Sequence, residues 1–171
     1  ASELPAGSTI VEIGCYGGLS TSYLAAGIKG KPGSKIIAMD PFNSDIDKQA
    51  ELTDGCVALD DKPTKALVAS RMQQRGYSDF VELVEGYSQN IAKNWNHSID
   101  FLWIDGNHEQ AYQDYIDFKP FLKKNARVAV HDAHPRYGYE AVVRDVRKIF
   151  ANDNEWRDLE QVKSIITAVR R

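Results

Sequence analysis

Acidic residues occur at or next to the ends of five short apolar runs in this sequence. They are Glu12, Asp40, Glu85, Asp105 and Asp132. If the runs are parallel strands, their carboxyl ends share one edge of a sheet, which is where open α/β sheets bind ligands. Carboxylates held close together repel one another, so the cluster needs ligand hydroxyls, an ammonium group or a metal cation as a partner. The alternative is that each acid only caps the helix that follows it.

Two histidines lie among these acids. His108 comes three residues after Asp105, and His131 directly precedes Asp132. Because imidazole titrates near neutral pH, His108 is a candidate general base, with helix capping or pairing with Glu109 as the alternative. His131 is either a metal ligand itself or the residue that holds Asp132 in place.

A glycine-rich turn follows the first apolar run, in the segment VEIGCYGGLST. Gly14, Gly17 and Gly18 allow the backbone to turn into a helix and to approach a ligand closely. Tyr16 departs from the Gly-x-Gly-x-x-Gly pattern of dinucleotide-binding domains, which argues against a nicotinamide cofactor. Asp40 ends the second run, where nucleotide-binding folds place the acid that accepts hydrogen bonds from a ribose diol. The combination predicts a nucleoside site.

The elements that position these residues follow from the apolar pattern. Five strands with few polar residues, as expected for strands covered on both faces, are predicted at Thr9–Ile13, Lys35–Met39, Phe80–Val84, Ile99–Ile104 and Ala126–Val130. Helical spacing predicts amphipathic helices at Gly18–Ile28, Pro63–Arg75, Glu109–Lys123 and Tyr139–Phe150. The alternation predicts an α/β fold with a doubly wound, mostly parallel, Rossmann-like sheet and helices on both faces.

Two details of this pattern are specific enough to test. The apolar face of the first helix is expected to consist of Leu19, Tyr23, Leu24 and Ile28. Two more strands, Arg157–Val162 and Ser164–Val169, are expected near the C-terminus, one of them antiparallel to the rest of the sheet. Because only Lys163 separates them, they fit an antiparallel hairpin poorly.

Length and composition indicate one globular domain, residues 1–171, with 43% hydrophobic and 26% charged residues. A net charge of −3 provides no basic surface for nucleic acid or membrane, and no apolar run reaches the roughly 18 residues of a membrane span. Cys15 and Cys56 allow at most one disulfide, which favours a cytoplasmic setting. Residues 41–62 form a long polar segment, either a lid or substrate-binding insertion or a plain surface loop.

The motifs, taken in order, resemble those of class I S-adenosylmethionine-dependent methyltransferases. They are most similar to the metal-dependent O-methyltransferases of the catechol O-methyltransferase type and of bacterial sugar and antibiotic metabolism. VEIGCYGGLST is similar to the first motif of that group, acid-x-Gly-x-Tyr-x-Gly-x-Ser, and MDPF to its ribose-binding motif. EGYSQNI resembles the stretch beside the adenine, and IDFLWIDGNHEQAY and AVHDA resemble the two metal-binding strands.

The resemblance implies a role for each matching residue. For the cofactor it implies contacts from Glu12 to the methionine amino group, Ser20 to the methionine carboxylate, Asp40 to the ribose, and Ser88 and Gln89 to the adenine, with Gly14, Tyr16, Gly18 and Asp105 lining the site. It implies that Asp105, His131 and Asp132 bind a divalent metal, either Mg²⁺ or a transition ion. It also implies that His108 deprotonates the acceptor, with Asp105 as the second catalytic residue.

The sequence departs from the family pattern at three points. Asn107 is an amide where the sugar-modifying branch has its proposed base, and His131 stands where a carboxylate is usual. The chain also begins almost at its first strand, whereas catechol-type enzymes carry helices before it. Either the chain is an excised domain, or it is a minimal member completed by a partner subunit, so a homo-oligomer stays open.

The expected function is therefore transfer of a methyl group from S-adenosylmethionine to a hydroxyl of a small molecule, with a divalent metal and with no nucleic-acid or membrane partner. Three alternatives differ in class. A metal-dependent hydrolase would use the His/Asp site but would need no nucleoside cradle. A nicotinamide dehydrogenase would need the missing dinucleotide pattern. A non-catalytic nucleotide-binding domain would not need acids at five strand ends.

Overall fold

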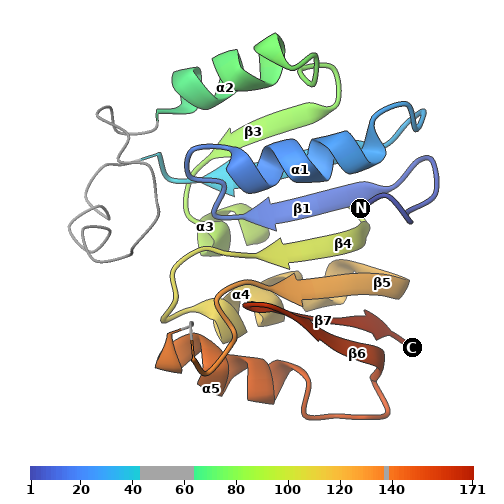
Figure 1. Cartoon of the computed structure of the whole chain (residues 1–171), viewed down its shortest axis with the longest axis vertical. Helices are drawn as coiled ribbons and strands as arrows, with labels where there is room; N and C mark the ends of the chain where they lie inside the picture. Colours follow the sequence, from blue (N-terminus) through green and yellow to red (C-terminus); the bar gives the residue numbers. More distant parts are fainter. Residues whose placement is uncertain (43–63, 137–138) are drawn as a thin grey trace.

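The computed structural model describes residues 1–42, 64–136 and 139–171, which form one twisted sheet with helices on both faces (Figure 1). The strands are β1 (Thr9–Ile13), β2 (Lys35–Asp40), β3 (Val81–Glu85), β4 (Ile99–Ile104), β5 (Leu122–Val130), β6 (Trp156–Val162) and β7 (Ile165–Arg170). The helices are α1 (Leu19–Ile28), α2 (Lys65–Gln74), α3 (Ser88–Ala92), α4 (Ala111–Phe118) and α5 (Glu140–Ile149), and a 3-10 turn, η2 (Lys119–Phe121), follows α4.

The strand order is β3-β2-β1-β4-β5-β7-β6. Strands β1 to β5 run parallel to one another, and β7 runs antiparallel to both of its neighbours, β5 and β6. The predicted fold class is thereby confirmed. The order reverses between β1 and β4, which are neighbours in the sheet although two strands separate them in the chain. This reversal is the switch point at which open α/β sheets bind ligands.

Each face of the sheet has its own apolar core, because alternate residues of the central strands point to opposite faces. On one face, Ile10 and Ile36 pack with residues of α1 and α2, such as Leu24 and Val68. On the other face, the core contains residues of α4 and α5, and its largest fully buried members include Tyr115 and Phe118 of α4. The central strands are thus buried from both sides, as their apolar composition predicts.

Two helix predictions were wrong in part. In α1, Leu19 and Tyr23 are 69% and 73% exposed, and the buried face is instead Thr21, Leu24, Ala25 and Ile28. The helix predicted at Glu109–Lys123 ends at Phe118, directly before η2, because Pro120 has no N–H to continue an α-helix. The following strand consequently starts at Leu122, four residues earlier than predicted, and the short helix α3 was not predicted at all.

The C-terminal strands pair as an antiparallel hairpin, contrary to the expectation from their spacing. Val162 pairs with Ile165, so the turn consists of two residues, Lys163 and Ser164. Lys163 has a φ of 54°, the left-handed conformation that such tight turns require. β7 also pairs with β5, and the turn therefore lies beside the carboxyl end of β5.

Two predictions from the sequence, the lid or insertion and the possible disulfide, concern residues that the structure does not describe. From residue 43 onward, the proposed lid or insertion at 41–62 is not among the described residues, and neither is Cys56. Within the described ranges, no helix has both the length and the apolar character needed to cross a membrane.

Candidate active site

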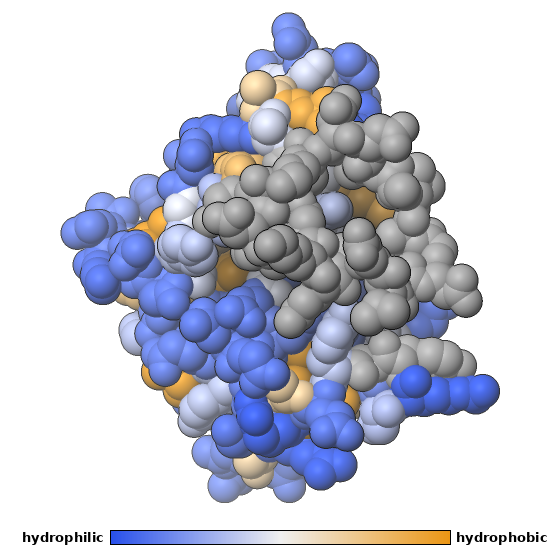
Figure 2. Space-filling view, turned by 90° about the vertical axis from the view of Figure 1, so that its left-hand side faces the viewer, coloured by the Kyte–Doolittle hydropathy of each residue, from blue (hydrophilic) through white to orange (hydrophobic). Residues whose placement is uncertain are grey.

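The strand order brings the acids at the strand ends to one edge of the sheet, the left-hand side of Figure 1. Across this edge the order is Glu85, Asp40, Glu12, Asp105 and Asp132. Backbone hydrogen bonds continue beyond the strands, from Gly14 to Met39 and from Asp105 to Ile13, and keep the ends level. Figure 2 views the molecule from this side, and most of the surface that is coloured by hydropathy there is hydrophilic. The predicted convergence of the acids is therefore present.

Glu12 lies at the centre of this edge and is fully buried. Neither of its carboxyl oxygens has a hydrogen-bond partner among the described residues. Burial raises the pKa of Glu12 to about 7, and the charges of Asp105 and Asp40 add to the rise. The nearby Ser20 and Thr21 hydroxyls offset part of it, although neither reaches hydrogen-bond geometry with the carboxyl oxygens. A buried carboxyl without a partner is costly, so this side chain requires a cationic or hydrogen-bonding ligand.

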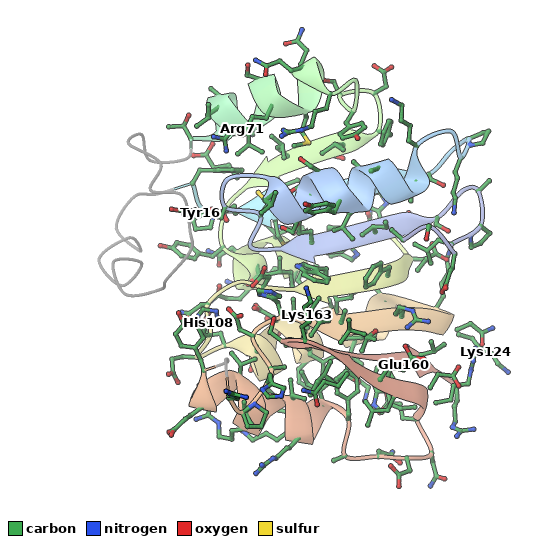
Figure 3. All side chains as sticks on the ribbon, in the orientation of Figure 1. Tyr16, Arg71, His108, Lys124, Glu160 and Lys163 are labelled. Atoms are coloured by element: carbon green, nitrogen blue, oxygen red, sulfur yellow. The ribbon has the colours of Figure 1, made fainter. Side chains whose placement is uncertain are left out.

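Asp40 is held in place by the backbone. Its Oδ2 accepts a hydrogen bond from the Tyr16 N–H at 2.9 Å, and its Oδ1 accepts one from the Phe42 N–H at 2.8 Å. Each carboxylate oxygen can accept further bonds, so Asp40 presents a fixed acceptor pair suited to two adjacent hydroxyls. Tyr16 is half-exposed and lies at the same edge as His108 (Figure 3).

The glycines of the turn after β1 are required by packing within the protein. A Cβ on Gly14 would lie 2.2 Å from the carbonyl oxygen of Asp105, and the φ of Gly14 is 82°. A Cβ on Gly18 would lie 2.9 Å from Cγ1 of Val68 in α2. The sequence-based interpretation, that these glycines serve close approach to a ligand, is thus incomplete. The turn also needs them to fit against β4 and α2.

The three proposed metal ligands converge at the ends of β4 and β5. Nδ1 of His131 lies 3.1 Å from Oδ1 of Asp105 and 3.2 Å from Oδ1 of Asp132. One ligand atom from each residue lies within 4.8 Å of the other two, a spacing at which three donors can share one ion. On the other side of the ring, Nε2 of His131 is 3.3 Å from Oγ of Ser164 in the β6–β7 turn. The ring is therefore held at both nitrogens.

The charges in this group are strongly coupled. Hydrogen bonds with Asp105 and Asp132 raise the pKa of His131 to about 10. Burial raises the pKa of Asp105, and the hydrogen bond with His131 offsets part of that rise. Burial also favours a higher pKa for Asp132. Hydrogen bonds from His108 and His131 outweigh this effect and hold the pKa of Asp132 well below its usual range. A protonated His131 therefore supplies the positive charge between the carboxylates of Asp105 and Asp132.

His108 lies at the mouth of this group and pairs with Asp132, with Nε2 and Oδ2 3.2 Å apart. Its ring stacks on Tyr139, with centroids 3.8 Å apart and an interplanar angle of 17°. It is partly exposed, so a ligand can reach it. Of the alternatives that the sequence left open, pairing with Glu109 is not seen; Glu109 lies near Arg144 instead. An imidazole oriented by a carboxylate is the arrangement of a general base.

Ser88 and Gln89, the predicted adenine contacts, begin helix α3 beside the β4–α4 loop. Ser88 Oγ lies 2.5 Å from Oδ1 of Asp114. Gln89 Nε2 donates to Oε1 of Gln110 at 3.2 Å, and Oε1 of Gln89 is buried without a partner in the described part of the chain. Both side chains are thus anchored to the loop and helix that follow Asp105.

Sequence reasoning did not single out three residues that the structure brings into the site: Tyr139, Ser164 and Asp114. Asp114 carried a usable signal, because it occupies the buried face of α4 with Ala111 and Tyr115, where an apolar residue is expected. Ser164 carried none, since its contact with His131 depends on the pairing of β7 with β5.

Comparisons with known proteins agree with this geometry. A family model described as a methyltransferase domain matches residues 11–133. The fold is similar to that of an O-methyltransferase from Bacillus cereus solved with S-adenosylhomocysteine, at 18% identity over 96% of this chain and 75% of that one, with a TM-score of 0.67. It is similar to the O-methyltransferase TomG of Streptomyces achromogenes, involved in tomaymycin synthesis and solved with S-adenosylmethionine, at 17% identity, 95% and 72% coverage and a TM-score of 0.67. It is also similar to Aeropyrum pernix fibrillarin with bound S-adenosylmethionine, at 15% identity, 96% and 67% coverage and a TM-score of 0.62.

Proposed function

This chain belongs to the family of methyltransferase domains, and from that premise we propose that it transfers the methyl group of S-adenosylmethionine to a hydroxyl group of a small molecule. The resemblance drawn from the sequence motifs is confirmed at the level of the family. We propose in addition that the acceptor is a hydroxyl group, that a divalent metal takes part, and that individual residues have the roles given below.

The observation that carries the proposal is the state of Glu12. This carboxyl is fully buried, has no partner among the described residues, and lies beside the glycine-rich turn at the switch point of the sheet. The ammonium group of the methionine part of the cofactor supplies both the positive charge and the N–H donors that Glu12 lacks. A buried acid of this kind has no evident use in a hydrolase that binds no nucleoside.

The remaining cofactor contacts follow from neighbouring elements. Asp40, fixed by two backbone N–H groups, would accept hydrogen bonds from the ribose hydroxyls. Ser20, in the first turn of α1, would bind the methionine carboxylate near the positive end of the helix. Ser88 and Gln89 would contact the adenine, and Gly14, Tyr16 and Gly18 would shape the turn around the cofactor.

His108 would carry out the acid–base chemistry. In the proposed reaction the hydroxyl oxygen forms a bond to the methyl carbon while the carbon–sulfur bond breaks and leaves a neutral thioether. The hydroxyl proton passes to His108, whose imidazolium form Asp132 stabilises. Tyr139 keeps the imidazole ring from turning away. The residues around the acceptor thus align it and activate its oxygen, which are the main requirements of an in-line displacement.

The donor set at the ends of β4 and β5 fits a divalent cation. Asp105, His131 and Asp132 offer two carboxylates and one imidazole within the span of a single ion. Imidazole suits Mn²⁺, Fe²⁺ or Zn²⁺ better than Mg²⁺, so a transition ion is expected to bind more tightly. When bound, the ion would act as a Lewis acid on the acceptor hydroxyl.

Calorimetry with S-adenosylhomocysteine tests the cofactor part of the proposal. Wild-type protein should bind it, and Asp40→Ala should weaken binding roughly ten- to hundredfold, because the hydrogen bonds to the ribose are lost. The control variant Asp79→Ala removes an exposed acid that lies in the turn before β3, away from the strand ends, and should bind like wild type. No binding by the wild type, combined with a thermal shift on adding NAD, would contradict the proposed function.

A titration with Mn²⁺ tests the metal site separately. Asp105→Ala should abolish Mn²⁺ binding and largely spare S-adenosylhomocysteine binding. Because the ion must displace the proton that His131 carries up to a pKa of about 10, the apparent Mn²⁺ affinity should rise as the pH increases from 6 to 9, by up to about tenfold per unit. Full methyltransferase activity after chelation would refute the metal role, and unchanged Mn²⁺ affinity in His131→Ala would remove that histidine from the ligands.

A further inference from the structure

Asp114 is a buried acid that the proposed chemistry does not use. It is 3% exposed and lies on the core-facing side of α4, between Ala111 and Phe118. Its Oδ1 is 2.5 Å from the Ser88 hydroxyl oxygen, which links α4 to the first residue of α3. Burial raises the pKa of Asp114 to about 7, so the carboxyl is ionised at pH 8, where it can only accept hydrogen bonds.

This contact fixes the direction of hydrogen bonding at Ser88. The single hydroxyl proton of Ser88 is donated to Asp114, so only the lone pairs of its oxygen are available to a ligand. Gln89 likewise has its donor occupied and its acceptor open. Its amide nitrogen donates to Gln110, while its Oε1 is buried and has no partner in the described part of the chain. Two adjacent side chains at the start of α3 therefore offer acceptors.

We propose that Asp114 is a positioning residue that makes this subsite select a base carrying an exocyclic amine. The inference rests on the proposed function, in which Ser88 and Gln89 lie against the base of the cofactor. The amine of adenine has N–H donors for the Ser88 and Gln89 oxygens. Hypoxanthine carries a carbonyl oxygen at the same position, which would face two acceptors, and its N1–H group can supply a proton to at most one of them.

Discrimination of this kind is large, because a site built around a ligand N–H group leaves buried groups unpaired when the donor is missing. We expect wild-type protein at pH 8 to bind S-adenosylhomocysteine at least about a hundredfold more tightly than S-inosylhomocysteine. The preference should depend on the carboxylate of Asp114 and on the hydroxyl of Ser88, although Asp114 itself is buried.

The test measures the affinity of both nucleosides for three variants by calorimetry at pH 8. Asp114→Asn keeps the size of the side chain but can present either an oxygen or an N–H group to Ser88, which frees the Ser88 proton for a carbonyl ligand. Its preference for S-adenosylhomocysteine should fall at least about tenfold. Ser88→Ala should weaken binding of S-adenosylhomocysteine but not of S-inosylhomocysteine, because it removes one of the two acceptors that face the carbonyl. Asp117→Asn, on the same helix and in contact with Gln113 rather than Ser88, should keep the wild-type preference.

The outcomes separate this inference from the proposed function. If wild-type protein binds neither nucleoside, the proposed function fails. If it binds S-adenosylhomocysteine but does not discriminate, or if Asp114→Asn retains the full preference, the inference is wrong and the proposed function stands. If Asp114→Asn loses affinity for both nucleosides in equal proportion while its melting temperature is unchanged, the role of Asp114 is general support of the pocket, and the inference is likewise overturned.

Discussion

Replacing Glu12 by glutamine is expected to weaken S-adenosylhomocysteine binding at least about a hundredfold and, at the same time, to stabilise the cofactor-free protein at pH 8. The loss of binding follows because the amide carries no charge for the ligand ammonium and offers one acceptor oxygen in place of two. The gain in stability follows because the buried carboxyl has no partner in the described structure, so its ionisation opposes folding.

The pH dependence has a definite sign. The pKa of Glu12 is raised from 4.5 to about 7 in the folded protein, so its contribution to stability is present below pH 4.5 and is lost as the pH rises to about 7. Above pH 7 the loss amounts to about 3 kcal/mol, an upper limit for the gain from Glu12→Gln because the buried amide also lacks partners.

Urea unfolding at pH 8 and calorimetry between pH 6 and 8 measure both effects. Wild-type affinity for S-adenosylhomocysteine should fall below pH 7, by up to about tenfold per unit, since Glu12 must release its proton to bind the ammonium group. In Glu12→Gln this fall in affinity below pH 7 should be absent. Glu160→Gln, on the exposed strand β6, is the matched control. Wild-type affinity in the glutamine variant would exclude Glu12 from the cofactor site.

The second large effect is expected for His108→Gln. Glutamine keeps hydrogen-bonding capacity towards Asp132 but cannot take up the acceptor proton at neutral pH, so turnover should fall roughly 10²–10⁴-fold. Binding of S-adenosylhomocysteine should not change, because His108 contacts Asp132 and Tyr139 rather than the proposed cofactor residues. The defect would therefore appear in kcat.

Measuring this effect requires an acceptor, which a screen of phenols, catechols and sugars for S-adenosylhomocysteine formation would supply. His97→Gln is the control, since His97 is an exposed residue in the loop before β4. Unchanged turnover in His108→Gln would assign proton removal to another group.

The parts of the fold that depend on local pattern were predictable. The strands that are apolar on both faces were found to within a residue or two, with the exception of the early start of β5, and their alternation with helices led to the correct sheet. The acids at the strand ends were then placed together by topology alone. Leu19 and Tyr23 were misplaced because their spacing fits an apolar stripe, whereas α1 packs on the sheet through Thr21, Leu24 and Ala25.

The contacts that complete the site were not predictable, since they join elements far apart in the chain. Ser164 reaches His131 across 33 residues and depends on the position of a two-residue turn. Tyr139, in the β5–α5 connection, stacks on His108, in the β4–α4 connection. No period or motif in a single sequence records such pairs. The buried Asp114 is intermediate, because its position on an apolar helix face could have been noticed but its partner Ser88 could not.

The close fit of Gly14 against Asp105 has a mechanical consequence. The loop proposed to hold the methyl donor and the strand end proposed to hold the acceptor touch through backbone atoms, with no room for even a Cβ between them. Their separation is therefore set by main-chain geometry and does not vary with side-chain rotamers. A displacement of about 1 Å can cost on the order of a hundredfold in rate. Substitutions of side chains around the proposed acceptor site would therefore leave the spacing between this loop and this strand end unchanged.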